Sequence, residues 1–390
     1  MRISELDFIR GFALITITVN HISDFCMDLG YTGYPIPTLT HLGYSSSAEL
    51  FFLISGYLIG FLYFRIDRDV RPISAAAKMM GRSVYIWAMN CVLFVWICAA
   101  AQFFPQTALS ALTLDQVAGD PFFWAYNVVK LGFNLPLLGI LNFYVVLILL
   151  AIPFAMVLLR SPGLALLIIL GLYAVCQTHP EINLPGGRFH GDELWTFNPL
   201  AWQALFFGGL FAGRFKFHEV LRAVAMERHL RPVLFAVWGT FVAVTLVYVY
   251  DQATGPLDMP LIGQQALEPV RLFHALLTFV VLLSTLFFLG ARKQNALYRI
   301  VCLTGSNSLQ AFMISVFLSY ILAMAWTVFA TTAAYIILDA TGVIVLLALA
   351  LVIDTYKRAA RGDWDTTSPQ LDSPKRPETS ALSASATSSA

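Results

Sequence analysis

The first apolar segment of the chain is residues 6–26, LDFIRGFALITITVNHISDFC. It is long and apolar enough to cross a bilayer, yet Arg10 and His21 lie within it. At about 100° and 1.5 Å per residue, Arg10 and His21 share one helix face about 16 Å apart. Ionisable groups are costly in hydrocarbon and normally face a cavity or a partner inside a helix bundle. A cation towards one surface and an imidazole towards the other predict a polar path through the protein.

The composition of the whole chain is that of a membrane protein. Of its 390 residues, 58% are hydrophobic and 12% are charged, and the mean hydropathy is +0.73. A soluble domain carries about 25% charged residues. The net charge of +1 gives no indication of nucleic-acid binding. The five cysteines lack metal-binding spacing and are interpreted as buried thiols.

Repeated apolar runs of about 20 residues predict an all-α, polytopic integral membrane protein with about ten transmembrane helices. With the N-terminus inside, most of the 24 Lys and Arg residues fall in cytoplasmic segments, as the positive-inside rule requires. Both termini are therefore predicted to be cytoplasmic, and Arg10 indicates an uncleaved first span rather than a signal peptide. The predicted spans are 6–26, 47–64, 83–103, 139–159, 163–178, 198–213, 232–250, 269–290, 303–326 and 331–353.

The chain divides into a membrane part and a tail. Residues 1–358 are predicted to form one transmembrane domain. Residues 359–390 turn to Ser, Thr, Ala and Pro, which predicts a disordered cytoplasmic tail. Within the membrane part, residues 122–136 predict an interfacial or re-entrant helix that ends near Pro136.

His21 has two interpretations. It is either a structural side chain that hydrogen-bonds across helices, or a catalytic base that takes the proton of a hydroxyl attacking an activated acyl group. Asp24, one turn further on, is the candidate carboxylate that orients the imidazole. Glu49 starts the second span and lies level with His21 if the two helices pack together. It would then share or tune the proton of His21; the alternative is a carboxylate stabilised by the helix dipole.

Further polar residues lie in spans two, six and nine. In the second span, Gly56 permits close helix approach and neighbouring Ser55 is a candidate binding residue. Asn307 lies near the start of the ninth span, where its side chain contacts either a neighbouring helix or a ligand. The sixth span opens with three polar or aromatic residues near the outer surface, which are Asn198, Trp202 and Gln203.

The eighth span opens with the sequence EPVRLFHALL. Arg271 and His274 form an i, i+3 pair on one helix face. Two interpretations of Arg271 are possible. It forms a structural ion pair with Glu268, or it belongs to a site that binds a carboxylate or a sugar hydroxyl.

The segment from Arg65 to Arg82 is strongly basic. Topology alone requires cations there, and the alternative is that some of them hold the phosphates of an anionic donor. The candidates for that role are Arg65, Arg68 and Arg82.

Arg10-x10-His21 resembles the arginine–histidine signature of the transmembrane acyltransferases, which acylate extracytoplasmic sugars. Within that superfamily the chain is similar to the OpgC family. The similar segments occur in the expected order between residues 5 and 320, and they are LDFIRGFALITITVNHI, SSAELFFLISGYLIG, FNPLAWQALFFGG, RLFHALL and GSNSLQAF.

The resemblance implies succinyl modification of osmoregulated periplasmic glucans, with a cytoplasmic succinyl-CoA donor, at the bacterial inner membrane. It implies that His21 is catalytic, that Arg10 helps to hold the donor, and that no metal or covalent cofactor takes part. The positions that match the family are Glu49, Asn198, Trp202, Gln203, Arg271, His274 and Asn307.

The favoured function is therefore a membrane O-acyltransferase that moves an acyl group from acyl-CoA to a hydroxyl of a periplasmic glucan. Succinyl is favoured over acetyl, and both direct transfer and an acyl-histidine intermediate are open. The alternative is a transporter or flippase for a small anionic or sugar-like substrate, although no internal repeat is visible. A non-catalytic scaffold or sensor is a third class, which would tolerate His21→Ala.

Overall fold

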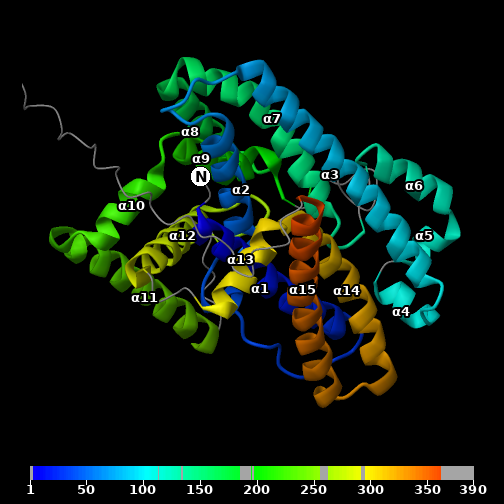
Figure 1. The fold of residues 1–390 in the computed structure, drawn as a ribbon. Coiled ribbons are helices and arrows are strands. Elements are labelled where there is room, and N and C mark those ends of the chain that lie inside the picture. Colours follow the sequence, from blue (N-terminus) through cyan, green and yellow to red (C-terminus); the bar gives the residue numbers. More distant parts are fainter. Residues whose placement is uncertain are drawn as a thin grey trace, which may run out of the picture. The chain divides into compact units, whose positions relative to one another are not determined.

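The computed structural model describes residues 3–112, 114–132, 135–184, 195, 197–254, 262–290 and 295–361. In these ranges every regular element is helical and no strand occurs, so the predicted all-α class is confirmed (Figure 1). The helices are α1 (Ser4–Asp28), η1 (Leu39–Leu42), α2 (Ser47–Tyr63), α3 (Pro72–Ala101), α4 (Gln106–Ala111), α5 (Asp115–Gly119), α6 (Pro121–Val129), α7 (Gly139–Arg160), α8 (Pro162–Thr178), α9 (Pro199–Arg214), α10 (Phe217–Met226), η2 (Arg228–Leu230), α11 (Arg231–Thr254), α12 (Pro269–Leu289), α13 (Ala296–Ser306), α14 (Ser308–Phe329) and α15 (Thr332–Arg361).

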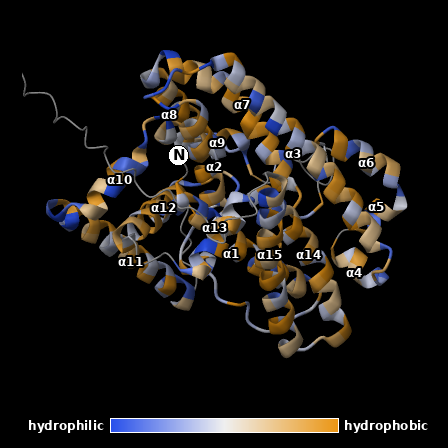
Figure 2. Cartoon of the chain, in the orientation of Figure 1, coloured by the Kyte–Doolittle hydropathy of each residue, from blue (hydrophilic) through white to orange (hydrophobic). Residues whose placement is uncertain are grey.

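Each of the ten predicted spans contains a helix, and Figure 2 shows that the long helices are predominantly hydrophobic. Within the described residues, six helices are long and apolar enough to cross a bilayer: α3, α7, α11 with its leading turn, α12, α14 and α15. The apolar helices α2 and α8 have 17 residues each and α9 has 16, which is short for a bilayer core. The chain is thus a multi-pass membrane protein, while ten crossings and cytoplasmic termini stay predictions.

Two element boundaries differ from the predictions. The helix α3 begins at Pro72, so Lys78 and Arg82 lie on a helix rather than in a loop. Proline is well suited to the first turn and the following alanines favour helix, which explains the early start. The helix expected over 122–136 is the short α6, which ends at Val129.

The ninth span is two helices instead of one. The break lies at Asn307, between α13 and α14. Its side-chain amide donates to the carbonyl oxygen of Leu303 at 2.9 Å and so satisfies a terminal carbonyl of α13. The break places Ser308 at the beginning of α14, where it faces α1.

The compact part of the chain extends from residue 1 to Leu351, and the last turns of α15 form a separate small unit from Val352. Of the predicted tail, residues 362–390 lie outside the described residues. The boundary at 358/359 therefore stays a prediction.

The helices α2 and α9 pack closely along matching glycines. A Cβ at Gly56 would meet the carbonyl oxygen of Phe206, and a Cβ at Gly209 would meet that of Leu53. Each helix repeats the pattern four residues later, at Gly60 and at Gly213. Such small-xxx-small patterns let helix backbones approach in membranes, so the role predicted for Gly56 is confirmed.

A substitution at this contact tests the packing. We expect Gly209→Ala to destabilise the protein by about 1–3 kcal/mol, because the added methyl meets backbone that cannot move aside. The measurement is the thermal unfolding midpoint of purified protein in detergent. Gly208→Ala is the matched control, since a Cβ there has nothing within 4 Å. Equal midpoints for the two variants would contradict the close contact.

Candidate active site

Arg10 is enclosed where α1, α2 and α14 meet. Its side chain is buried, and Nη2 donates a hydrogen bond to Oγ of Ser308 at the start of α14. The guanidinium carbon lies 5.8 Å from the ring centroid of Phe51 on α2. A cation over an aromatic face is stabilised by the ring quadrupole. The structure therefore holds this buried cation against two other helices.

His21 lies eleven residues further along α1 and is partly buried. Its Nδ1 atom is shielded from solvent and has no hydrogen-bond partner among the described residues. Neither of the two predicted carboxylates, Asp24 and Glu49, bonds to Nδ1, and the side chain of Asp24 is exposed. A buried imidazole nitrogen without a partner has the capacity to bind a proton or a substrate hydroxyl.

The connection from α1 to α2 is attached to α1 beside His21. Asn20 donates from Nδ2 to Oγ1 of Thr40 at 2.9 Å and accepts from Oγ1 of Thr38 at 2.8 Å. The backbone N–H of Thr38 donates to Nδ1 of His41 at 3.1 Å. These bonds fix the loop against the C-terminal half of α1.

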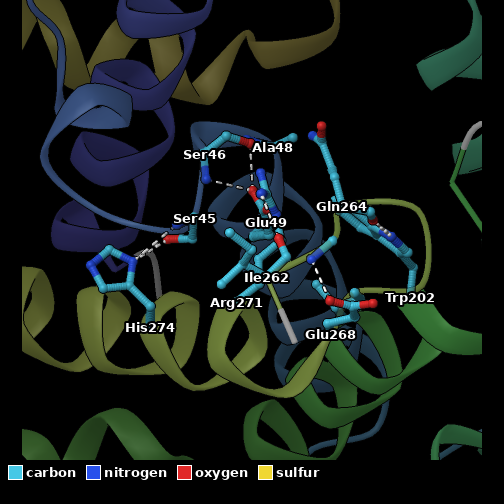
Figure 3. A network of polar contacts seen from close by, with 12 residues as sticks. Ser45, Ser46, Ala48, Glu49, Trp202, Ile262, Gln264, Glu268, Arg271 and His274 are labelled. Atoms are coloured by element: carbon cyan, nitrogen blue, oxygen red, sulfur yellow. Dashed lines mark hydrogen bonds and ion pairs between the residues drawn. The ribbon is translucent and has the colours of Figure 1, made fainter. Parts of the chain in front are cut away.

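Glu49 is fully buried in a network with Arg271 and Ser46 (Figure 3). Its Oε1 accepts from Nε of Arg271 at 2.5 Å. Its Oε2 accepts from the backbone N–H of Ser46 at 2.9 Å and from the Ser46 hydroxyl at 2.5 Å. Glu49 thus completes a capping box at the start of α2 and neutralises a cation from α12.

Glu268 is not the partner of Arg271, so the structural alternative of an ion pair between them is wrong. Glu268 instead accepts the backbone N–H of Gly263 at 2.6 Å, immediately before α12 (Figure 3). Arg271 turns towards α2 because Glu49 presents a desolvated carboxylate there. Its side chain is 15% exposed, so the guanidinium keeps a limited opening to the surroundings.

His274 is held in one tautomer. Nδ1 accepts the backbone N–H of Ser45 at 3.2 Å and lies 2.7 Å from the Ser45 hydroxyl (Figure 3). The neutral ring therefore carries its proton on Nε2, which is buried and has no partner in the part of the chain that the structure describes. Gly43 lies against the Cε1–Nε2 edge, where a Cβ would collide with the ring. Phe241 of α11 stacks on the other side, with 5.8 Å between ring centroids.

A small cavity of about 10 Å³, enough for one water molecule, lies beside His274. Hydroxyl and imidazole side chains line it from the α1–α2 loop, from the start of α2 and from α12. Apolar side chains, including Phe241, complete its wall. The polar members are Thr40, Ser45, Ser46, Ser47, His274 and Thr278.

Three predicted binding residues bond to backbone carbonyls of the chain itself. Asn198 donates to the carbonyl of Ile182 at 2.7 Å, and Trp202 donates to that of Gln264 at 2.9 Å. Gln203 donates to the carbonyl of Ile169 within α8 at 2.9 Å. All three side chains are buried, so Asn198 and Trp202 support loops and Gln203 links α9 to α8. Substrate contact by these residues stays a prediction.

The remaining candidates lie deeper in the bundle or at its basic side. Ser55 has a buried hydroxyl without a partner among the described residues and lies one turn beyond Phe51 on α2. Arg82 lies beside the hydroxyl of Tyr144. Arg68 is exposed. The three side chains therefore have different surroundings.

Two basic segments of the chain meet around Asp67: the connection between α2 and α3, and the residues around Lys216 after α9. Asp67 bonds to Arg65 and lies 3.6 Å from Nζ of Lys216. The backbone N–H of Ile66 donates to the carbonyl of Arg214 at 3.1 Å. Partial desolvation raises the pKa of Asp67, but the hydrogen bond and charge of Arg65 and the charge of Lys216 outweigh it and lower the pKa. The cations around Asp67 thus form one surface.

Ser45, Ser46, Phe51, Asp67 and Phe241 were missed by sequence reasoning. A signal existed for Ser46, because Ser-x-x-Glu before an apolar run is a capping-box pattern. No sequence motif identifies the other four; Ser45, Phe51 and Phe241 contact residues far away in the sequence, and Asp67 contacts Lys216 as well as the nearby Arg65.

These features define a multi-pass helical membrane protein with buried cations and imidazoles. A family model described as "OpgC protein" matches residues 2–358. The chain therefore belongs to the OpgC family, which places it among the membrane acyltransferases of glucan modification. No curated protein and no solved structure matches the chain.

The Glu49–Arg271 pair is testable by a double-mutant cycle. Either Glu49→Gln or Arg271→Gln alone leaves a buried charge uncompensated, and we expect each to cost about 3–5 kcal/mol. The double variant should cost less than the sum, with a coupling of about 1–3 kcal/mol. Thermal or denaturant unfolding in detergent measures these values. Additive losses would show that the pair does not interact, and Glu268→Gln with Arg271→Gln is the control pair.

Proposed function

We propose that this protein is an inner-membrane O-acyltransferase that moves a succinyl group from cytoplasmic acyl-CoA to a hydroxyl of a periplasmic glucan. The observation that carries the proposal is the arrangement on α1. Arg10 is held at the bundle interior, and eleven residues further on His21 presents a buried nitrogen without a partner. The hydroxyl-lined cavity lies next to the loop that is bonded to Asn20.

The donor binds at the basic side. Arg65, Arg68 and Arg82 supply cations for the phosphates of coenzyme A, and the segment around Lys216 adds to the same surface. The flexible arm of the donor passes Arg10, which lies about 16 Å along the helix from His21. Succinyl-CoA or acetyl-CoA is a co-substrate in this scheme, and no bound cofactor is required.

The transfer step is an acyl exchange between sulfur and oxygen. Nδ1 of His21 takes the proton of a glucan hydroxyl while its oxygen attacks the thioester carbonyl carbon. The carbon–sulfur bond breaks, the ester bond forms, and the proton passes from His21 to the coenzyme A thiolate. The Nε2–H of His274 is suited to donate to a substrate oxygen, because Ser45 occupies Nδ1. A two-step route through acyl-His21 transfers the same atoms.

Arg271 is the proposed partner of the distal succinyl carboxylate. Glu49 occupies its Nε, and a guanidinium carries further N–H donors for a second carboxylate. Asp24 has a supporting role through its charge near the outer end of α1. Asn198, Trp202, Gln203 and Asn307 shape the surrounding loops and helix ends.

The test uses the full chain in nanodiscs with acyl-CoA and periplasmic glucan. We expect donor-dependent thiol release and a matching mass gain on the glucan. His21→Ala should lower the rate by about 10²–10⁴-fold, as loss of a general base does. His229→Ala, at an exposed side chain, is the matched control and should keep full activity.

Two outcomes would contradict this proposal. Folded wild-type protein that transfers no acyl group from either donor would favour the transporter. A fully active His21→Ala variant would remove His21 from the mechanism.

A further inference from the structure

Asp339 is a carboxyl that the structure buries without an ion-pair partner among the described residues. It lies on α15, which is long and apolar enough to cross a bilayer, about 10 Å beyond the start of that helix. The residue is 3% exposed, and its Oδ1 has no hydrogen-bond partner in the described part of the chain. The buried carboxylate of Glu49 is different, because Arg271 compensates its charge.

The titratable groups that interact with Asp339 are neutral. They are the thiol of Cys26 on α1 and the phenol of Tyr335, one turn earlier on α15. The Tyr335 hydroxyl is already engaged, since it lies 2.6 Å from Oγ of Ser23 and accepts the backbone N–H of Ile36 at 2.9 Å. No Lys, Arg or His of the described ranges acts on the Asp339 carboxyl. A negative charge there would therefore lack compensation.

Neighbouring elements close the space around this face of α15. A Cβ at Gly342, one turn beyond the carboxyl, would meet side chains of Ile22 on α1 and Leu322 on α14. The loop after α1 contributes Tyr31, whose ring stacks on that of Tyr335 with 4.4 Å between the centroids. These groups are apolar or uncharged, and they keep water away from the carboxyl.

We propose that Asp339 is a proton-binding site within the membrane part of the protein, and that its carboxyl is neutral when the chain is folded. A carboxylate that loses its hydration and gains no cation in return binds a proton instead. The neutral carboxyl allows α15 to pack against α1 and α14, whereas an ionised one would require water or a cation at this contact. Asp339 takes no part in the proposed acyl transfer, so the inference is independent of that function.

Infrared spectroscopy of the full chain tests the proposal. At about pH 6 a hydrated Asp carboxyl is ionised, because its pKa is about 4. The wild type, in a detergent that contains no ester, should nevertheless show the C=O stretching band of a protonated carboxyl, and this band should shift in heavy water. Asp339→Asn should remove that component. Asp354→Asn is the matched control on the same helix and should keep it, because Asp354 lies 2.8 Å from Nη2 of Arg358.

The pH dependence of unfolding gives a second measurement. The folded wild type keeps the proton, while the unfolded chain releases it above about pH 4, so rising pH favours unfolding. Asp339→Asn lacks the titrating group and cancels the contributions of the other acids. Relative to this variant, the unfolding constant of the wild type should rise about tenfold between about pH 5 and about pH 6.

A wild-type spectrum without a protonated-carboxyl band would overturn the inference, and this result does not depend on any variant folding. So would a band that Asp339→Asn leaves unchanged, or a ratio of unfolding constants that stays constant or falls as the pH rises. Asp339→Ala, which is also uncharged, replaces the asparagine variant if that variant does not fold.

Discussion

A buried charge in a membrane bundle needs compensating groups from neighbouring helices, and this constraint organises the structure. Arg10 is held by Ser308 and by the ring of Phe51, which draws α1, α2 and α14 together. Arg271 is held by Glu49, which joins α12 to the start of α2. On another side of α2, matching glycines let α2 and α9 approach closely.

The polar groups near the site differ in how they are compensated. Glu49 and Arg271 neutralise each other, whereas the buried nitrogens Nδ1 of His21 and Nε2 of His274 have no partner among the described residues. Unsatisfied buried polar atoms cost stability, which a ligand that completes them offsets. The proposed acyl transfer uses these two histidine nitrogens.

Local patterns were enough to predict the all-α class, the helix-bearing segments and the close approach at Gly56. Long-range pairing was not predictable, because Glu49 and Arg271 lie 222 residues apart in the chain. The apolar pattern likewise predicted a single helix for the ninth span. The break into α13 and α14 is visible only in the structure, where Asn307 caps Leu303. For Trp202, aromatic and polar character was compatible with ligand binding, but its indole holds a loop carbonyl. Whether such a side chain binds a ligand or a backbone carbonyl depends on which backbone groups the fold leaves without a hydrogen bond.

The central claim is that one protein carries an acyl group across the membrane from a donor on one side to an acceptor on the other. Proteoliposomes with glucan sealed inside and isotope-labelled acyl-CoA added only outside test it directly. The account predicts label on the enclosed glucan, with coenzyme A thiol released outside and no label with His21→Ala. Labelling that requires donor and glucan on the same side of the membrane would contradict it.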